Sequence, residues 1–287
     1  MPVVMRRPGP PLDGLVTTIA CRYGEQPQAS VEKILPSAQT GLWVNLNRDT
    51  FRSFGDGGRE RRVPGAMLAG PTSRAAAFEF EQGHAHVTVS FALGGAGRFF
   101  TVPLVQAADD LVPLEDLWGR AGASLRERLL EAGSPRDALE VMEGALLDHL
   151  RGSFSPDPAM LAAAAALSRG ARVTSVADDL GLLPRTLRRR FTAEVGLGPK
   201  RFGRVQRMKR LVRDLDGRTE VDWAAEAVGH GYADQPHLAD EFRELAGVTA
   251  TEYLRSRING PNHLRFEQPR DAGRLLSVCA DVTWVTG

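Results

Sequence analysis

Two stretches in the second half of the chain repeat one pattern, a little over fifty residues apart. Each combines a short apolar helix, a glycine turn and a second helix with a phenylalanine near its end. Both copies then continue alike, as FTAEVGLGPKRF from Phe191 and as FRELAGVTATEY from Phe242. Repeated supersecondary units bury their apolar faces against one another. The repeat therefore predicts one all-helical domain over residues 159–257.

The first copy, residues 173–191, reads VTSVADDLGLLPRTLRRRF. Ser175 is the expected N-cap of its first helix. Gly181 can supply the positive φ of the turn, and Pro184 suits the first position of the second helix. Such a pair predicts a helix-turn-helix, in which the first helix braces the second in the major groove of DNA.

The outer face of this second helix is strongly basic, with Arg185, Arg188, Arg189 and Arg190. Guanidinium groups can donate two hydrogen bonds to guanine O6 and N7, or can hold phosphates. A solvated arginine face on an ordinary helical hairpin is the structural alternative.

The two copies differ in net charge. Residues 169–213, which include the first copy and most of a long helix predicted from Lys200 to Leu215, hold thirteen Lys and Arg and three Asp and Glu. Residues 214–257 hold four Arg and ten acids. Since phosphate neutralisation supplies most non-specific affinity, we expect the first copy and the long helix to dominate DNA binding. Asp240 and Glu241 are expected to face DNA unfavourably, with the second copy serving mainly as packing support.

Residues 14–151 predict a separate β-rich domain, so that the fold class is α+β with a small β-barrel or sandwich and some helices in the N-terminal part. Expected strands are 15–22, 31–35, 41–46, 76–81 and 87–91, and residues 52–64 are expected to form an exposed loop. Helices are expected near 112–119, 124–131 and 134–150, and a linker at 152–158. Residues 1–13 are expected to be mobile, and the sequence leaves the tail, residues 258–287, undecided.

Composition is that of an ordinary globular protein of 287 residues, with 43% hydrophobic and 25% charged residues. Cys21 and Cys279 lie far apart, without the spacing of a zinc site. No apolar leader or membrane-spanning run is present, so the expected location is the cytoplasm.

The repeated units resemble those of the AraC/XylS family of transcriptional regulators. The resemblance rests on VADDLGLLPRTLRRRF, VGLGPKRFGRVQRMKRL and EAVGHGYADQPHLADEFRELAGVTATEY. More loosely, LPSAQTGLWVNL, GAMLAGPTSR and VPLEDLWG are similar to the N-terminal sensor domain of a subgroup. Family members often carry a cupin-like barrel there, which binds an effector or mediates dimerisation.

The resemblance implies roles for particular residues. Base edges would be contacted by Arg185, Arg188, Arg189, Gln235 and His237. Phosphates would be contacted by Thr186, Arg190, Lys200, Arg201 and Arg204, although Arg190 and Arg204 are also candidates for packing roles. The second unit departs from the family where Pro236 replaces a small polar residue and Asp240 replaces a basic one.

The sequence thus predicts a sequence-specific regulator that binds double-stranded DNA, with no catalytic residues, metal or cofactor and no membrane partner. The resemblance adds a small-molecule effector, a homodimer and, if the protein is an activator, RNA polymerase. One alternative is a cupin-type metal-dependent enzyme or sensor fused to a DNA-binding module. It rests on His84 and His86, for which surface positions are favoured because no glutamate follows. Another alternative is a helical protein–protein adaptor.

Overall fold

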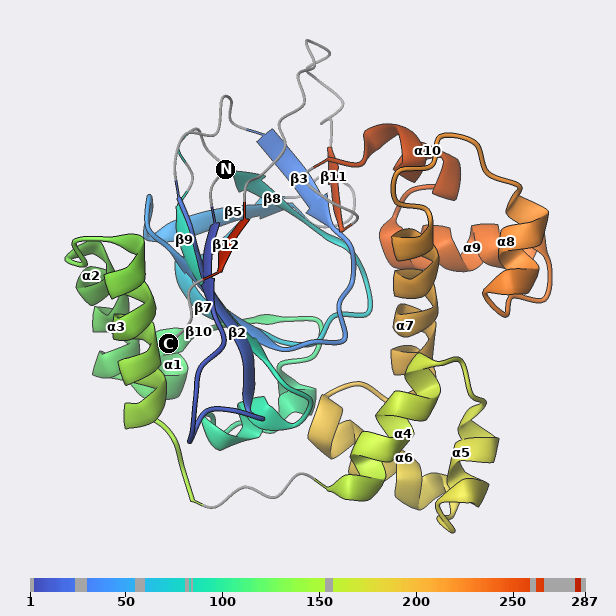
Figure 1. The fold of residues 1–287 in the computed structure, drawn as a ribbon, viewed down its shortest axis with the longest axis horizontal. Helices are drawn as coiled ribbons and strands as arrows, with labels where there is room; N and C mark the ends of the chain where they lie inside the picture. The colour runs from blue at the N-terminus through green and yellow to red at the C-terminus, as the bar shows by residue number, and fades with distance from the viewer. Residues whose placement is uncertain are drawn as a thin grey trace.

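The computed structural model describes residues 3–23, 30–54, 60–80, 83, 85–152, 157–258, 262–265 and 282–284. It consists of a β-rich N-terminal part flanked on one side by helices and a helical C-terminal part on the other side (Figure 1). This arrangement confirms the predicted α+β class.

Two sheets form the β-rich part. Their orders are β10-β7-β4-β9-β2-β1-β12 and β11-β3-β8-β5-β6, and their paired strands are antiparallel except for β1 and β12. In an apolar cluster at the second sheet, Trp43 stacks on Phe78 and meets Phe51 edge-on. The strands are β1 (Val3–Arg6), β2 (Val16–Arg22), β3 (Ser30–Ile34), β4 (Gly41–Asn45), β5 (Thr50–Phe54), β6 (Glu60–Pro64), β7 (Ala66–Ala69), β8 (Ala76–Phe80), β9 (His86–Phe91), β10 (Leu111–Pro113), β11 (His263–Arg265) and β12 (Val282–Trp284).

Two expectations for this part are wrong. The segment expected to be mobile contains β1, which pairs with β2. The segment expected to be a loop contains β5 and β6, whose connection at 55–59 lies outside the described residues. Its polar residues are compatible with strands because they pair across the sheet. Arg52 donates to Glu60 and Glu79 at 2.8–2.9 Å, while Phe51 and Val63 point into the core.

Three helices cover the seven-stranded sheet: α1 (Leu114–Trp118), α2 (Arg120–Leu130) and α3 (Pro135–Asp148). The expected N-cap of α3 is confirmed, since Ser134 accepts a hydrogen bond from the Asp137 N–H group. Two short 3₁₀ helices, η2 (Gly95–Arg98) and η3 (Leu104–Gln106), connect β9 to β10. Trp118 is buried at the end of η2, where it donates its indole N–H to the Phe99 carbonyl.

The helical part contains two three-helix units and a final helix. The first unit is α4 (Pro158–Ser168), α5 (Val173–Asp179) and α6 (Pro184–Val195). The second is α7 (Pro199–Asp214), α8 (Trp223–Gly229) and α9 (Gln235–Ala246), followed by α10 (Ala250–Ser256). Both predicted helix-turn-helix pairs are present. The expected cap at Ser175 is wrong, because α5 begins earlier, with Arg172 at the N-cap.

The described part of the C-terminal tail returns to the sheets, with β11 beside β3 and β12 beside β1 (Figure 1). Leu264 of β11 is buried in the core of the second unit together with Leu35, which follows β3. The Leu35 N–H group also donates to the Asn262 carbonyl at 2.9 Å. The tail therefore ties the second unit to the N-terminal part.

Replacing Leu264 with alanine should destabilise the protein by about 2–5 kcal/mol, because a buried leucine leaves a cavity when it is shortened. Arg265→Ala, one residue further along β11, is the matched control and should change stability by under about 0.5 kcal/mol. Thermal and urea unfolding of both variants would check this. Equal stability of the two variants would mean that β11 is not docked as described.

Candidate DNA-binding surface

Helix α6 has one buried and one basic face. Leu187 and Phe191 are fully buried, and the Phe191 ring meets the Phe202 ring edge-on at 5.2 Å between centroids. The opposite face exposes three of the four predicted arginines, Arg185, Arg188 and Arg189. The fold thus gathers these three guanidinium groups on one solvent-facing helix surface.

Glycines set both ends of α6. Gly181 takes a φ of 61° in the turn from α5, and Gly196 takes a φ of 83° where the helix ends. A Cβ atom on Gly196 would lie 2.7 Å from Pro71 Cγ and 2.9 Å from the Leu104 carbonyl oxygen. The end of α6 is therefore pressed against η3 of the N-terminal part, and this contact fixes the position of the first unit.

Arg190 does not share the exposed face. Its Nε donates to Asp157 Oδ2 at 3.0 Å, and Asp157 is also the N-cap of α4. Burial acts to raise the pKa of Asp157, but hydrogen bonds from Arg190 and the Ala159 N–H outweigh it and hold the pKa below its usual value. The pair joins α6 to α4, which favours the packing role for Arg190. Thr186 is half-buried at the edge of the same face.

The basic residues of α7 divide into two groups. Lys200 and Arg201 are exposed at its start, with Arg201 3.8 Å from Asp109. Arg204 instead donates to Glu241 at 2.8 Å and to Glu244 at 3.1 Å, both on α9. The hydrogen bonds that Arg204 donates to Glu244 raise the pKa of Arg204 against the opposing effect of burial, and Glu241 raises it further.

Glu241 does not face outward, so the expectation that it confronts DNA is wrong. Its carboxylate is buried and accepts hydrogen bonds from Arg204 and, at 2.7–3.0 Å, from Arg207. Arg207 also lies 4.4 Å above the Tyr232 ring. This ionic cluster fastens the second recognition helix, α9, to α7.

The outer face of α9 carries no arginine or lysine in its first two turns. Gln235, Pro236, His237 and Asp240 are exposed there. Asp234 caps the helix by accepting from the His237 N–H at 2.8 Å, and the His237 ring accepts from the Ala233 N–H at 3.1 Å. Gln235 and His237 are thus both exposed in the first turn of α9, and their contacts to bases stay a prediction.

The prediction of surface positions for His84 and His86 can be compared with the structure. His86 is buried and stacked on Trp43 with ring centroids 5.9 Å apart, so the surface position expected for it is wrong. His84 lies outside the described residues. Within the described ranges, no group of three His, Cys, Asp or Glu side chains is placed to hold a metal ion. Nor does any helix described here have the length and apolarity needed to cross a membrane.

The paired units, the exposed arginine face and the joining helix α7 are features of proteins that bind DNA with tandem helix-turn-helix units. Residues 160–256 match the family model described as a helix-turn-helix domain. The matched region is a helix-turn-helix domain of the AraC type, and a chain that carries it is a DNA-binding transcriptional regulator. Residues 5–113 match a family described as a domain of unknown function, DUF6597.

Comparison with curated protein sequences gave no match. Among solved structures, ToxT from Vibrio cholerae is similar over 82% of this chain and 97% of its own, with 11% identity and a TM-score of 0.45. The AraC-like transcriptional activator CuxR is similar over 72% of this chain and 86% of its own, with 14% identity and a TM-score of 0.23.

Two features of the site have no counterpart in the sequence predictions. Leu183 is exposed at the start of α6, and Lys209 of α7 lies in a cavity between the two parts of the molecule. The repeat could have indicated Leu183, because the second copy has aspartate at the corresponding position. The cavity is assembled from segments far apart in sequence, and the chain carries no local signal for it.

Glu241→Ala should lower stability by about 3 kcal/mol, because it leaves Arg204 and Arg207 half-buried without their shared carboxylate. Asp240→Ala changes the neighbouring exposed carboxylate and should have an effect under about 0.5 kcal/mol. Chemical unfolding of both variants tests the difference. If both are equally stable, the ionic cluster contributes nothing to the attachment of α9.

Proposed function

We propose that the first unit makes the dominant contact with operator DNA. In this proposal Arg185, Arg188 and Arg189 reach base edges in a major groove. The exposed start of α7, with Lys200 and Arg201, and the hydroxyl of Thr186 hold the neighbouring phosphates. The observation that carries the proposal is the exposed arginine face of α6, set on a buried apolar back.

The second unit contributes less in this scheme. Gln235 and His237 are its candidates for base contacts, because they stand at the start of α9. Asp240 is also exposed, 3.7 Å from Arg243, and adds a negative charge to the same surface. A carboxylate near phosphates opposes binding, so the affinity of this unit for DNA should depend on few contacts.

Arg188→Ala and Arg189→Ala should each weaken operator binding about tenfold and reduce the discrimination between operator and unrelated DNA, because each removes a contact to a base edge. Arg128→Ala, which removes an exposed arginine from α2, is the control and should leave both quantities unchanged. DNA fragments from a genomic library, including the region upstream of the protein's own gene, provide the ligand for titrations at several salt concentrations. Equal affinity and equal discrimination for all four proteins would contradict the proposal.

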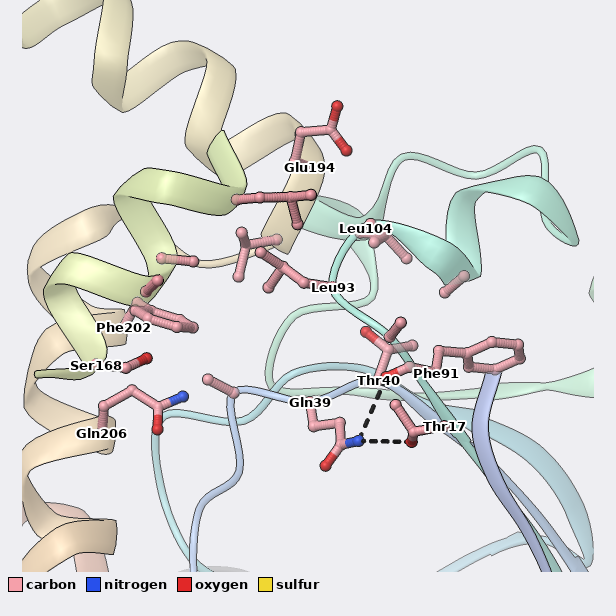
Figure 2. A pocket seen from close by; sticks show the side chains of 18 of the residues that line it. Thr17, Gln39, Thr40, Phe91, Leu93, Leu104, Ser168, Glu194, Phe202 and Gln206 are labelled. Atoms are coloured by element: carbon pink, nitrogen blue, oxygen red, sulfur yellow. Dashed lines mark hydrogen bonds between the residues drawn. The ribbon is translucent and has the colours of Figure 1, made fainter. Parts of the chain in front are cut away.

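We further propose that the N-terminal part senses a small molecule in the cavity that contains Lys209. The cavity measures about 350 Å³ and lies between β-domain loops and helices α4, α6 and α7. Figure 2 shows Leu93 and Leu104 opposite Phe202 and Gln206, while the Phe91 ring points away from the cavity. Gln39 is held in the wall by donating to the Phe91 carbonyl at 3.3 Å and to Thr17 Oγ1 at 3.5 Å.

Lys209 gives this cavity a preference for anions. Burial lowers the pKa of Lys209, because its ammonium group loses hydration in the wall of the cavity. An anionic group bound beside the ammonium would compensate for its desolvation. Glu194, which also lines the cavity (Figure 2), has its pKa raised by burial and by the nearby Asp157. A molecule with one acidic group and an apolar body fits this combination of charges and walls.

A ligand in this cavity would touch both parts of the chain at once. Its walls include Leu104 of η3 and Val195 of α6, next to the tight contact at Gly196. A ligand shifts an equilibrium by its difference in affinity for the two states. Occupancy would therefore favour one packing of the first unit against the N-terminal part.

Homodimerisation and contact with RNA polymerase stay predictions from the resemblance.

Lys209→Met should weaken binding of the probe 1-anilinonaphthalene-8-sulfonate about tenfold, since a charge-assisted contact to a half-buried ammonium is lost. Arg213→Met removes an exposed cation from the same helix and should leave the dissociation constant unchanged. Fluorescence titration of the folded variants measures both. If Lys209→Met binds the probe as tightly as the unaltered protein, the anionic probe does not bind beside Lys209.

A further inference from the structure

The two units differ in how their helices begin. In the second unit, Asp222 caps α8 and Asp234 caps α9 through hydrogen bonds from their side chains to backbone N–H groups. The corresponding positions of the first unit are Arg172 and Leu183, neither of which makes a side-chain cap. The first unit therefore gives up a stabilising interaction at the start of its recognition helix.

Leu183 is unfavourable in a second respect. Its side chain is 57% exposed, whereas its neighbour Leu182 packs against the core of the first unit. An aspartate at position 183 would place a negative charge on a surface that faces phosphates, which explains why the first unit has none there. This reason does not explain why the residue is leucine, because serine or threonine would cap the helix without adding charge. Leu183 neither caps the helix nor buries its apolar side chain, and a residue that departs from both local preferences indicates a functional role and not a structural one.

We propose that Leu183 is a specificity-determining residue that packs against the 5-methyl group of a thymine in the operator. It lies two residues before Arg185, at the end of the recognition helix that enters the major groove first. The thymine methyl is the apolar group that base pairs present in that groove. Leu183 would thus read a thymine adjacent to the guanines contacted by the arginines. This inference rests on the proposed DNA contact of the first unit.

The test starts from duplexes that the full-length protein selects from a random pool. Each dT in a selected duplex is replaced singly by deoxyuridine, which removes only the methyl group. Binding is then measured for the unaltered protein, for Leu183→Ala and for Leu183→Ser, which restores a capping side chain. Val228→Ala, which shortens an exposed apolar residue of α8, is the matched control.

We expect one substitution to deoxyuridine to weaken binding by the unaltered protein and by Val228→Ala about fourfold, the effect of losing one buried methyl-sized contact. Both Leu183 variants should be insensitive to that substitution and should keep the original salt slope, since no charge changes. Leu183→Ser should also raise the Tm through its cap. If the protein selects a sequence but no deoxyuridine substitution distinguishes the Leu183 variants from the unaltered protein, the role of Leu183 is overturned and the DNA-reading function is not. Absence of any selected sequence would overturn the DNA-reading function itself.

Discussion

Helix α7 must bury its apolar side against both helix-turn-helix units, and the arrangement of the C-terminal part depends on this requirement. Phe202 and Val205, in its first half, belong to the core of the first unit. Met208, Leu211 and Val212 belong to the core of the second. Because a continuous helix keeps these two sets in a fixed relation, the separation of the two recognition helices is set by α7.

Each unit also uses an ion pair at the same position to attach its recognition helix. In the first unit Arg190 of α6 meets Asp157 at the start of α4. In the second unit Glu241 of α9 meets Arg204 and Arg207 of α7. The recognition helix contributes a cation in the first unit and an anion in the second. Part of the basic charge of the first unit and part of the acidic charge of the second are therefore neutralised in ion pairs between helices. Counting charges along the sequence therefore overstates how much the exposed surfaces differ.

Local patterns in the sequence were sufficient for the helical part. Helical spacing, glycine turns and the repeat predicted the helices of both units within a few residues, and the arginine face of α6 follows from the same spacing. Burial of Glu241 could not be predicted, because it depends on which side of α9 meets α7. Strands β5 and β6 were missed since their polar residues look like a loop until cross-strand partners such as Arg52 and Glu79 are known. The cavity around Lys209 depends on contacts between segments more than a hundred residues apart.

The attachment of β11 has a consequence for how such regulators exchange their domains. The matched helix-turn-helix region ends at residue 256, yet the core of its second unit is completed by Leu35 and Leu264, which lie on either side of it in the sequence. A recombination event that joined residues 160–256 to a different N-terminal part would leave an apolar gap in that core. Here the N-terminal part and the DNA-binding part can be inherited separately only if the new N-terminal part supplies side chains that fill this gap.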